Sequence, residues 1–203
     1  LEQPDPEPIR QQFVDATSEV LGEGAKEFAG PIGVIDVDRS GWNSLFVVEP
    51  RQGFRLLRNS GGTFQPSGPL YPTPMDGRFR TVLVGDLQND RFEDVVVLGQ
   101  QGCHVFRFST NGLAEDVSAF SQLDGVTAMG GTLMDLDFTG KLDLVVVQAE
   151  SGEVKVYRQS EPLRFNPITE ASGIPASLRD AEAVLMEDWN GDGMGDLVIP
   201  RRT

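Results

Sequence analysis

Short apolar runs separated by polar turns recur along the whole chain. Four of these runs are rich in β-branched residues and bounded by turn residues, at positions 45–48, 95–98, 144–147 and 197–199. Uninterrupted runs of this length are typical of strands covered on both faces. A shorter apolar strand precedes each run, the first of them at 33–35.

A third strand follows the second in three places, at 54–58, 104–107 and 154–158, and each ends in an arginine, Arg58, Arg107 or Arg158. Polar turns come next, and Asn111-Gly112 in particular favours a tight hairpin. A looser fourth strand is expected around Phe64, at 113–117 and at 165–169. Because the arginines recur so regularly, we interpret them as partners of carboxylates or carbonyls that stabilise each sheet.

An acidic loop lies between the first and second strands of every unit. The four loops span residues 36–44, 86–94, 135–143 and 188–196, so their first residues are 50, 49 and 53 positions apart. This self-similarity indicates four copies of one unit. A sheet of four antiparallel strands cannot cover its own two faces, whereas radial packing of such sheets as propeller blades does cover them. The sequence therefore predicts an all-β fold, a partial β-propeller of about four blades.

The predicted boundaries follow from proline and glycine. Residues 1–11, with prolines at 4, 6 and 8, are expected to be a linker, and 12–203 the propeller fragment, starting with a strand at 12–17. The stretches 66–80 and 170–182 are expected to connect blades. We interpret the chain as an excerpt, so the remainder of its own longer chain is one expected partner.

The acidic loops have the composition of a calcium site. In 188–196, oxygen side chains stand at positions 1, 3, 5 and 9, and Gly193 at position 6 permits a sharp turn. An EF-hand would require Glu at position 12, where this chain has Ile199, and a strand follows instead of a helix. Position 7 would contribute a backbone carbonyl.

Up to four structural Ca²⁺ ions are thus predicted. The candidate ligands are Asp188, Asn190, Asp192, Met194 and Asp196; Asp86, Gln88, Asp90, Phe92 and Asp94; Asp135, Asp137, Thr139, Lys141 and Asp143; and Asp36, Asp38, Ser40 and Trp42. The loop starting at Asp36 has only two carboxylates and is expected to be the weakest. An acidic turn without an ion is the alternative for any single loop; four copies in register favour ion binding.

Position 2 of every loop is apolar, as Val37, Leu87, Leu136 and Trp189. Its side chain points away from the oxygen ligands, so we expect it to pin the loop onto the core. Trp42, at position 7, is expected to be exposed.

The motifs D-x-D-x-S-G, D-x-Q-x-D, D-x-D-x-T-G and D-x-N-x-D-G-x-x-D, each followed by a valine-rich strand, together resemble the FG-GAP/VCBS repeats of integrin-α-like propellers. The resemblance covers roughly residues 12–203. It implies a calcium-loaded β-propeller, usually of about seven blades, on secreted or surface proteins. This chain has four loops, and its last unit stops after the second strand.

The formal net charge of -14 argues against nucleic acid and anionic membrane surfaces as partners, because either polyanion would be repelled. Eleven carboxylates occupy ligand positions, and four divalent ions would bring the charge to -6. No run of 18 apolar residues predicts membrane insertion. The single cysteine leaves the compartment open, whereas calcium loops favour an extracellular, cell-surface or periplasmic location, where calcium is abundant.

An enzyme is the alternative that the sequence supports least. Cys103 and His104 are neighbours, but adjacent strand residues face opposite sides of a sheet, and no hydrolase, phosphate-loop, zinc or dinucleotide fingerprint occurs. The leading hypothesis is a noncatalytic, calcium-stabilised module for adhesion or protein interaction, with a protein ligand. The alternative is a carbohydrate-binding or accessory domain of a larger secreted enzyme, with a glycan ligand.

Overall fold

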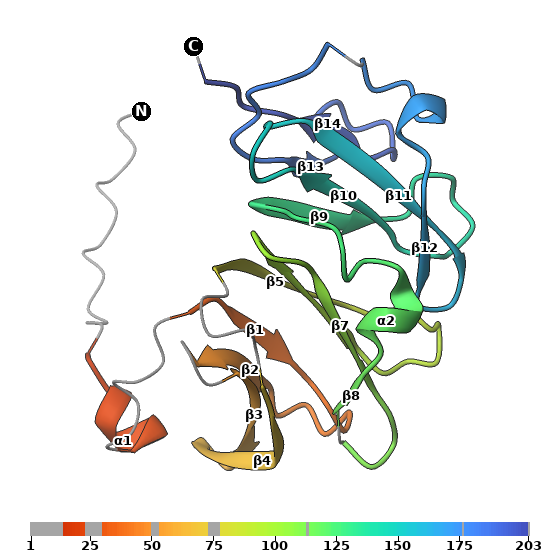
Figure 1. The fold of residues 1–203 in the computed structure, drawn as a ribbon. Coiled ribbons are helices and arrows are strands. Elements are labelled where there is room, and N and C mark those ends of the chain that lie inside the picture. Colours follow the sequence, from red (N-terminus) through yellow and green to blue (C-terminus); the bar gives the residue numbers. More distant parts are fainter. Residues whose placement is uncertain are drawn as a thin grey trace, which may run out of the picture.

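The computed structural model describes residues 14–22, 30–49, 53–72, 78–112, 114–175 and 177–202. Within them the chain forms four antiparallel sheets that follow one another in sequence and in space (Figure 1). The first consists of β1 (Ile32–Ile35), β2 (Ser44–Glu49), β3 (Gly53–Ser60) and β4 (Thr63–Pro72). The second consists of β5 (Phe79–Gly85), β6 (Asp94–Gly99), β7 (His104–Phe108) and β8 (Ala114–Asp116).

The third sheet consists of β9 (Gly130–Met134), β10 (Asp143–Val147), β11 (Val154–Glu161) and β12 (Arg164–Pro167), and the fourth of β13 (Leu185–Glu187) and β14 (Asp196–Val198). Each sheet keeps its strands in chain order. Short helical segments are α1 (Thr17–Leu21), α2 (Ser118–Ser121) and η2 (Thr169–Ala171). None of the helices in the described segments has the length and apolar character to cross a bilayer.

The first strands of successive sheets lie next to one another, β1 against β5, β5 against β9 and β9 against β13. The sheets therefore pack face to face around their first strands, which is the arrangement expected of propeller blades. Figure 1 shows β1–β4 and β13–β14 at opposite ends of this series. The prediction of an all-β, partial β-propeller-like fold is confirmed.

Apolar packing between sheets makes up the core. Every residue of β6 and of β10 is buried, and their side chains alternate between the two neighbouring sheets. Val95 and Val97 pack against the first sheet, beside Phe46 and Phe54. Val96 and Leu98 pack instead among the residues that join the second and third sheets. The continuous valine runs are thus explained by burial on both faces.

Two predicted elements differ from the structure. The strand expected at 12–17 is absent from its described part, since 14–16 form no regular element and Thr17 begins α1; the linker expected at 1–11 lies outside the described residues. The stretch 66–72, expected to be a connection, belongs to β4. Prolines are tolerated there because β4 is the edge strand, where an amide hydrogen is not needed on the outer side.

The four acidic loops in the structure

All four acidic loops connect the first and second strands of their sheets, as predicted. We call 36–43, 86–93, 135–142 and 188–195 loops 1 to 4, and the residue that follows each loop position 9. Neighbouring loops touch: the amide of Asp36 donates to Glu93 Oε2 over 2.9 Å, and Asn89 Nδ2 donates to the Gly140 carbonyl over 2.8 Å. Loops 1, 2 and 3 therefore occupy one edge of the assembled sheets.

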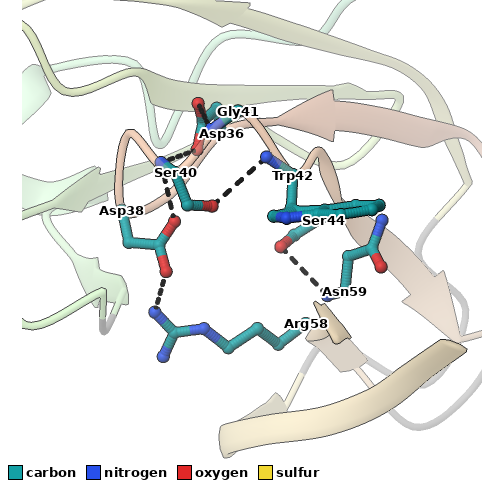
Figure 2. Close-up of polar contacts among 8 residues, drawn as sticks. All are labelled: Asp36, Asp38, Ser40, Gly41, Trp42, Ser44, Arg58 and Asn59. Carbon is teal, nitrogen blue, oxygen red and sulfur yellow. Dashed lines mark hydrogen bonds and ion pairs between the residues drawn. The ribbon is translucent and has the colours of Figure 1, made fainter. Parts of the chain in front are cut away.

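Position 1 organises each loop by accepting two backbone hydrogen bonds. In loop 1, Asp36 Oδ1 accepts from the amide of Ser40 (3.1 Å) and Asp36 Oδ2 from that of Gly41 (2.9 Å), as Figure 2 shows. Asp86, Asp135 and Asp188 accept the equivalent pairs of amides in their loops. The same bonds hold four different sequences in one shape.

This shape requires left-handed backbone at positions 4 and 6 in every loop. Position 4 is Arg39 (φ 57°), Asn89 (55°), Phe138 (56°) or Gly191 (76°), and position 6 is Gly41 (80°), Arg91 (74°), Gly140 (82°) or Gly193 (83°). Glycine adopts such φ values without strain, whereas a side chain there is strained. Loop 2 is the exception at position 6, because it places Arg91 where the others have glycine.

In loops 1 and 4, side-chain oxygens of positions 1 and 3 accept the same backbone amide. In loop 4 the amide of Asp192 donates to both Asp188 Oδ1 (3.1 Å) and Asn190 Oδ1 (2.9 Å). In loop 1 the amide of Ser40 is shared in the same way by Asp36 and Asp38. Oxygen donors that converge on one point are what a hard cation requires.

The side chain at position 5 forms hydrogen bonds to position 7 or to position 3 of its loop. Asp90 and Asp192 accept the amides of Phe92 and Met194, and Ser40 Oγ accepts that of Trp42. In loop 3, Thr139 Oγ1 donates to Asp137 Oδ1 over 2.7 Å, and this bond lowers the pKa of Asp137. Lys141, at position 7, directs its ammonium away to the Ser160 carbonyl.

Position 9 has a role that the sequence analysis missed. Asp94 is fully buried, with Oδ2 accepting from the amide of Leu87 and Oδ1 from that of Phe108, both over 3.0 Å. Ser44, Asp143 and Asp196 accept equivalent amides from Asn59, Gln159 and Trp189. Where a third strand exists, this side chain therefore ties the loop end to the third strand of its sheet. The sequence did contain a signal for this burial, because position 9 stands at the start of a continuous apolar strand.

Burial changes the proton affinity of these carboxyls. It raises the pKa of Asp94 to about 7, against the opposing effect of its two amide hydrogen bonds. Burial also raises the pKa of Asp143, against the opposing effect of backbone hydrogen bonds from Gln159 and Leu136.

The donor set fits a calcium ion in its chemistry and in the convergence of positions 1 and 3. Acidic side chains alone do not complete a coordination shell, because no three Asp, Glu, His or Cys groups of the described residues are close enough to hold a metal. The remaining ligands would have to come from Asn190, Gln88, Thr139, Ser40 and backbone carbonyls. Asp94 and Asp196 could coordinate only through lone pairs that their amide partners leave unused.

The apolar residues of the loops divide into two groups. Val37 and Leu87 are buried, as expected for position 2, and Leu136 packs against the core from a partly buried position. Trp189 was expected to do the same, and that prediction is wrong: it is 65% exposed. No sheet of the described chain follows the fourth one to cover it. Trp42 (54%) and Phe138 (66%) are exposed as well.

The third-strand arginines contact carboxylates, as predicted. Arg58 pairs with Asp38 at 2.5 Å (Figure 2) and Arg158 with Asp137 at 3.3 Å, in both cases at position 3 of the loop. Arg107 has Gln88 at the corresponding position and pairs instead with Glu115 at 2.6 Å. Cys103 and His104 have packing roles: the thiol donates to the Val126 carbonyl, and the imidazole lies against the rings of Phe54 and Phe79.

Comparison with known proteins agrees with this geometry. A family model described as FG-GAP-like repeat matches residues 36–97 and 135–199. A search of curated proteins finds no match. Among solved structures, a chain of the Photorhabdus luminescens Tc holotoxin pore is similar over 89% of this chain, with 20% identity and a TM-score of 0.51. This chain corresponds to 9% of that one, so the similarity concerns the fold alone.

Replacing Arg91 with glycine should stabilise the protein. The substitution relieves a left-handed side chain and keeps the amide bond to Asp86, so we expect R91G to raise the free energy of unfolding by about 0.5–1 kcal/mol. Urea denaturation measures the change. The matched control is Arg80, an exposed residue of β5, where R80G should lower stability by a similar amount. An R91G protein no more stable than the parent would contradict the strain argument.

Asp94 should make stability pH-dependent in chelator. Its folded pKa of about 7 lies above the ordinary 3.8, so the folded state retains a proton that the unfolded state releases. The stability contribution is therefore complete below pH 4 and is lost as pH rises to about 7, with a slope of at most about 1.4 kcal/mol per pH unit. Urea denaturation of the wild type and D94N at pH 5, 6, 7 and 8 isolates this group, since other titrations cancel in the difference. A difference in the free energy of unfolding between wild type and D94N that stays constant from pH 5 to pH 8 would contradict the raised pKa of Asp94.

Proposed function

The chain belongs to the FG-GAP-like repeat family, and on that premise we propose that it is a noncatalytic, calcium-stabilised β-propeller module for protein interaction or adhesion. The observation that carries the proposal is the repetition of one acidic loop at one place in four successive sheets. A catalytic site needs one constellation of different groups, whereas a repeated loop serves a repeated structural purpose.

The ions would act structurally. In each loop the carboxylate at position 1 accepts the backbone amide of position 5, and most of the side chains at positions 3 and 5 are acids or amides. A divalent cation removes the repulsion between such carboxylates and joins residues of one loop. With a dissociation constant of about 0.1 mM and calcium at about 2 mM, linkage contributes about 1.8 kcal/mol per site. Affinity in this range is useful only where calcium is abundant, so the proposal places the chain in an extracellular, cell-surface or periplasmic location.

The loop-bearing edge offers a surface for a protein partner. Trp42 of loop 1, Phe138 of loop 3 and Trp189 of loop 4 each expose more than half of their side chain. Phe138 also has a φ of 56°, so it costs backbone strain as well as apolar exposure. Large aromatic side chains are the commonest anchors of protein interfaces, and nothing in the packing of the described chain explains the exposure of Trp42 and Phe138.

Calcium should raise the melting temperature of this 203-residue chain. Each occupied site is expected to add about 4–7 °C, because about 1 kcal/mol moves the midpoint of a domain of this size by about 2–4 °C. Thermal denaturation followed by circular dichroism, in 2 mM calcium and in chelator, tests this. The double variant D188N/D192N should lose one site's share of the shift. A midpoint indifferent to calcium would remove calcium from the proposed function.

Protein binding should depend on the exposed aromatic residues. We expect the immobilised chain to retain partner proteins from the extracellular fraction of its source in calcium, and the variant W42A/F138A/W189A to lose them. Leu70, exposed on β4, supplies the control: L70A should bind as the parent does. Equal retention by the triple variant would contradict this surface, and retention of defined glycans on an array would favour a carbohydrate-binding accessory domain instead.

A further inference from the structure

The loops differ in whether the protein itself places a positive charge on them. Arg58 and Arg158 occupy the same register in their sheets, each just before the residue whose amide bonds to position 9. Both guanidinium groups reach back to the position 3 carboxylate, Asp38 or Asp137. Figure 2 shows the Arg58 side chain extended across the opening of loop 1 to Asp38.

Loop 2 shows that this contact depends on the residue at position 3. Arg107 has the register of Arg58 and Arg158, since the next amide, that of Phe108, bonds to Asp94. Position 3 is the uncharged Gln88, whose amide group donates to Asp90. Arg107 turns away to Glu115 on β8. The third-strand arginine therefore contacts the loop only where position 3 is a carboxylate.

Loop 4 has no ion pair with an arginine or lysine among the described residues, because the described fourth sheet has two strands and lacks the third strand that carries the arginine in the other sheets. Its position 3 is Asn190, which donates to Asp192 Oδ2, and its carboxylates are exposed. In loop 1 the guanidinium of Arg39 lies over the ring of Phe92, 5.9 Å from its centroid.

We infer that Arg58 and Arg158 are built-in counter-cations that compete with a divalent ion for position 3, so that removing either arginine tightens calcium binding at its own loop. This inference rests on the calcium role proposed above. A guanidinium on Asp38 neutralises part of the charge that attracts the ion and occupies one of its ligand oxygens. Removing the Arg58 charge should tighten ion binding at loop 1 roughly tenfold. A change of this size corresponds to the Coulomb repulsion between a unit charge and a nearby divalent ion at a solvated surface.

The two tryptophans allow loops 1 and 4 to be measured separately. The chain has 2 tryptophans, Trp42 in loop 1 and Trp189 in loop 4, and an excited indole sensitises the luminescence of Tb³⁺, a calcium substitute, only at short range. In W189F the Trp42-sensitised signal reports loop 1, and in W42F the Trp189-sensitised signal reports loop 4. Titrating Tb³⁺ and then displacing it with calcium gives the dissociation constant at each loop.

We expect R58M in the W189F background to lower the loop 1 dissociation constant roughly tenfold. Methionine keeps the apolar stem and removes the charge. R107M is the matched control, because it removes an equivalent charge that is paired on β8, and it should leave loop 1 within about twofold of the parent. Binding at loop 1 that appears only in R58M supports the inference as well.

Other outcomes overturn specific claims. Tb³⁺ binding at loop 4 together with a loop 1 affinity indifferent to Arg58 contradicts the counter-cation role alone. Equal tightening by R107M and R58M shows a general charge effect and also contradicts it. Sensitised signal from neither loop, in the parent and in R58M, contradicts both the inference and the calcium role on which it rests.

Discussion

Burial of each second strand between two neighbouring sheets is the constraint on which the rest of this structure depends. Val95 and Val97 of β6 face one sheet while Val96 and Leu98 face the next, so no sheet covers both of its own faces. Each sheet requires its neighbours, and stability is spread over successive interfaces. The faces at the two ends of the series remain partly exposed, as Ile32, Val34 and Leu185 show.

The acidic loops are positioned by the same strands. Position 9 lies at the start of the buried strand, and its side chain accepts amides of the loop, of the third strand or of both, as Asp94 does. A polar side chain at this depth is tolerated because backbone donors satisfy it. Positions 1, 3 and 5 lie outside the core, where their oxygens are held by amides and remain accessible. Each loop thus combines a polar side chain at position 9, held by backbone amides, with oxygens at positions 1, 3 and 5 that stay outside the core.

Charge within the loops is balanced differently from sheet to sheet. Arg58 and Arg158 neutralise position 3 where it is acidic, and Arg107 leaves the loop where it is not. Exposed pairs of this kind contribute little to stability on their own. We propose that their effect on a competing cation is larger, because it would add electrostatic repulsion to the loss of a ligand. Four loops of one backbone shape need not be equivalent sites.

The local pattern of the sequence determined the repeat, the strands and the place of the loops. Uninterrupted valine-rich runs and acidic turns are properties of neighbouring residues, so β2, β6 and β10 could be located almost to the residue. Tertiary structure alone decided that Trp189 is exposed and that 66–72 extends β4. It also decided that Asp94 is buried and accepts two backbone amides, and that Arg58 and Arg107 pair with carboxylates in different places. Each of these depends on which sheet lies alongside, and burial and charge pairing arise between residues that are distant in the chain.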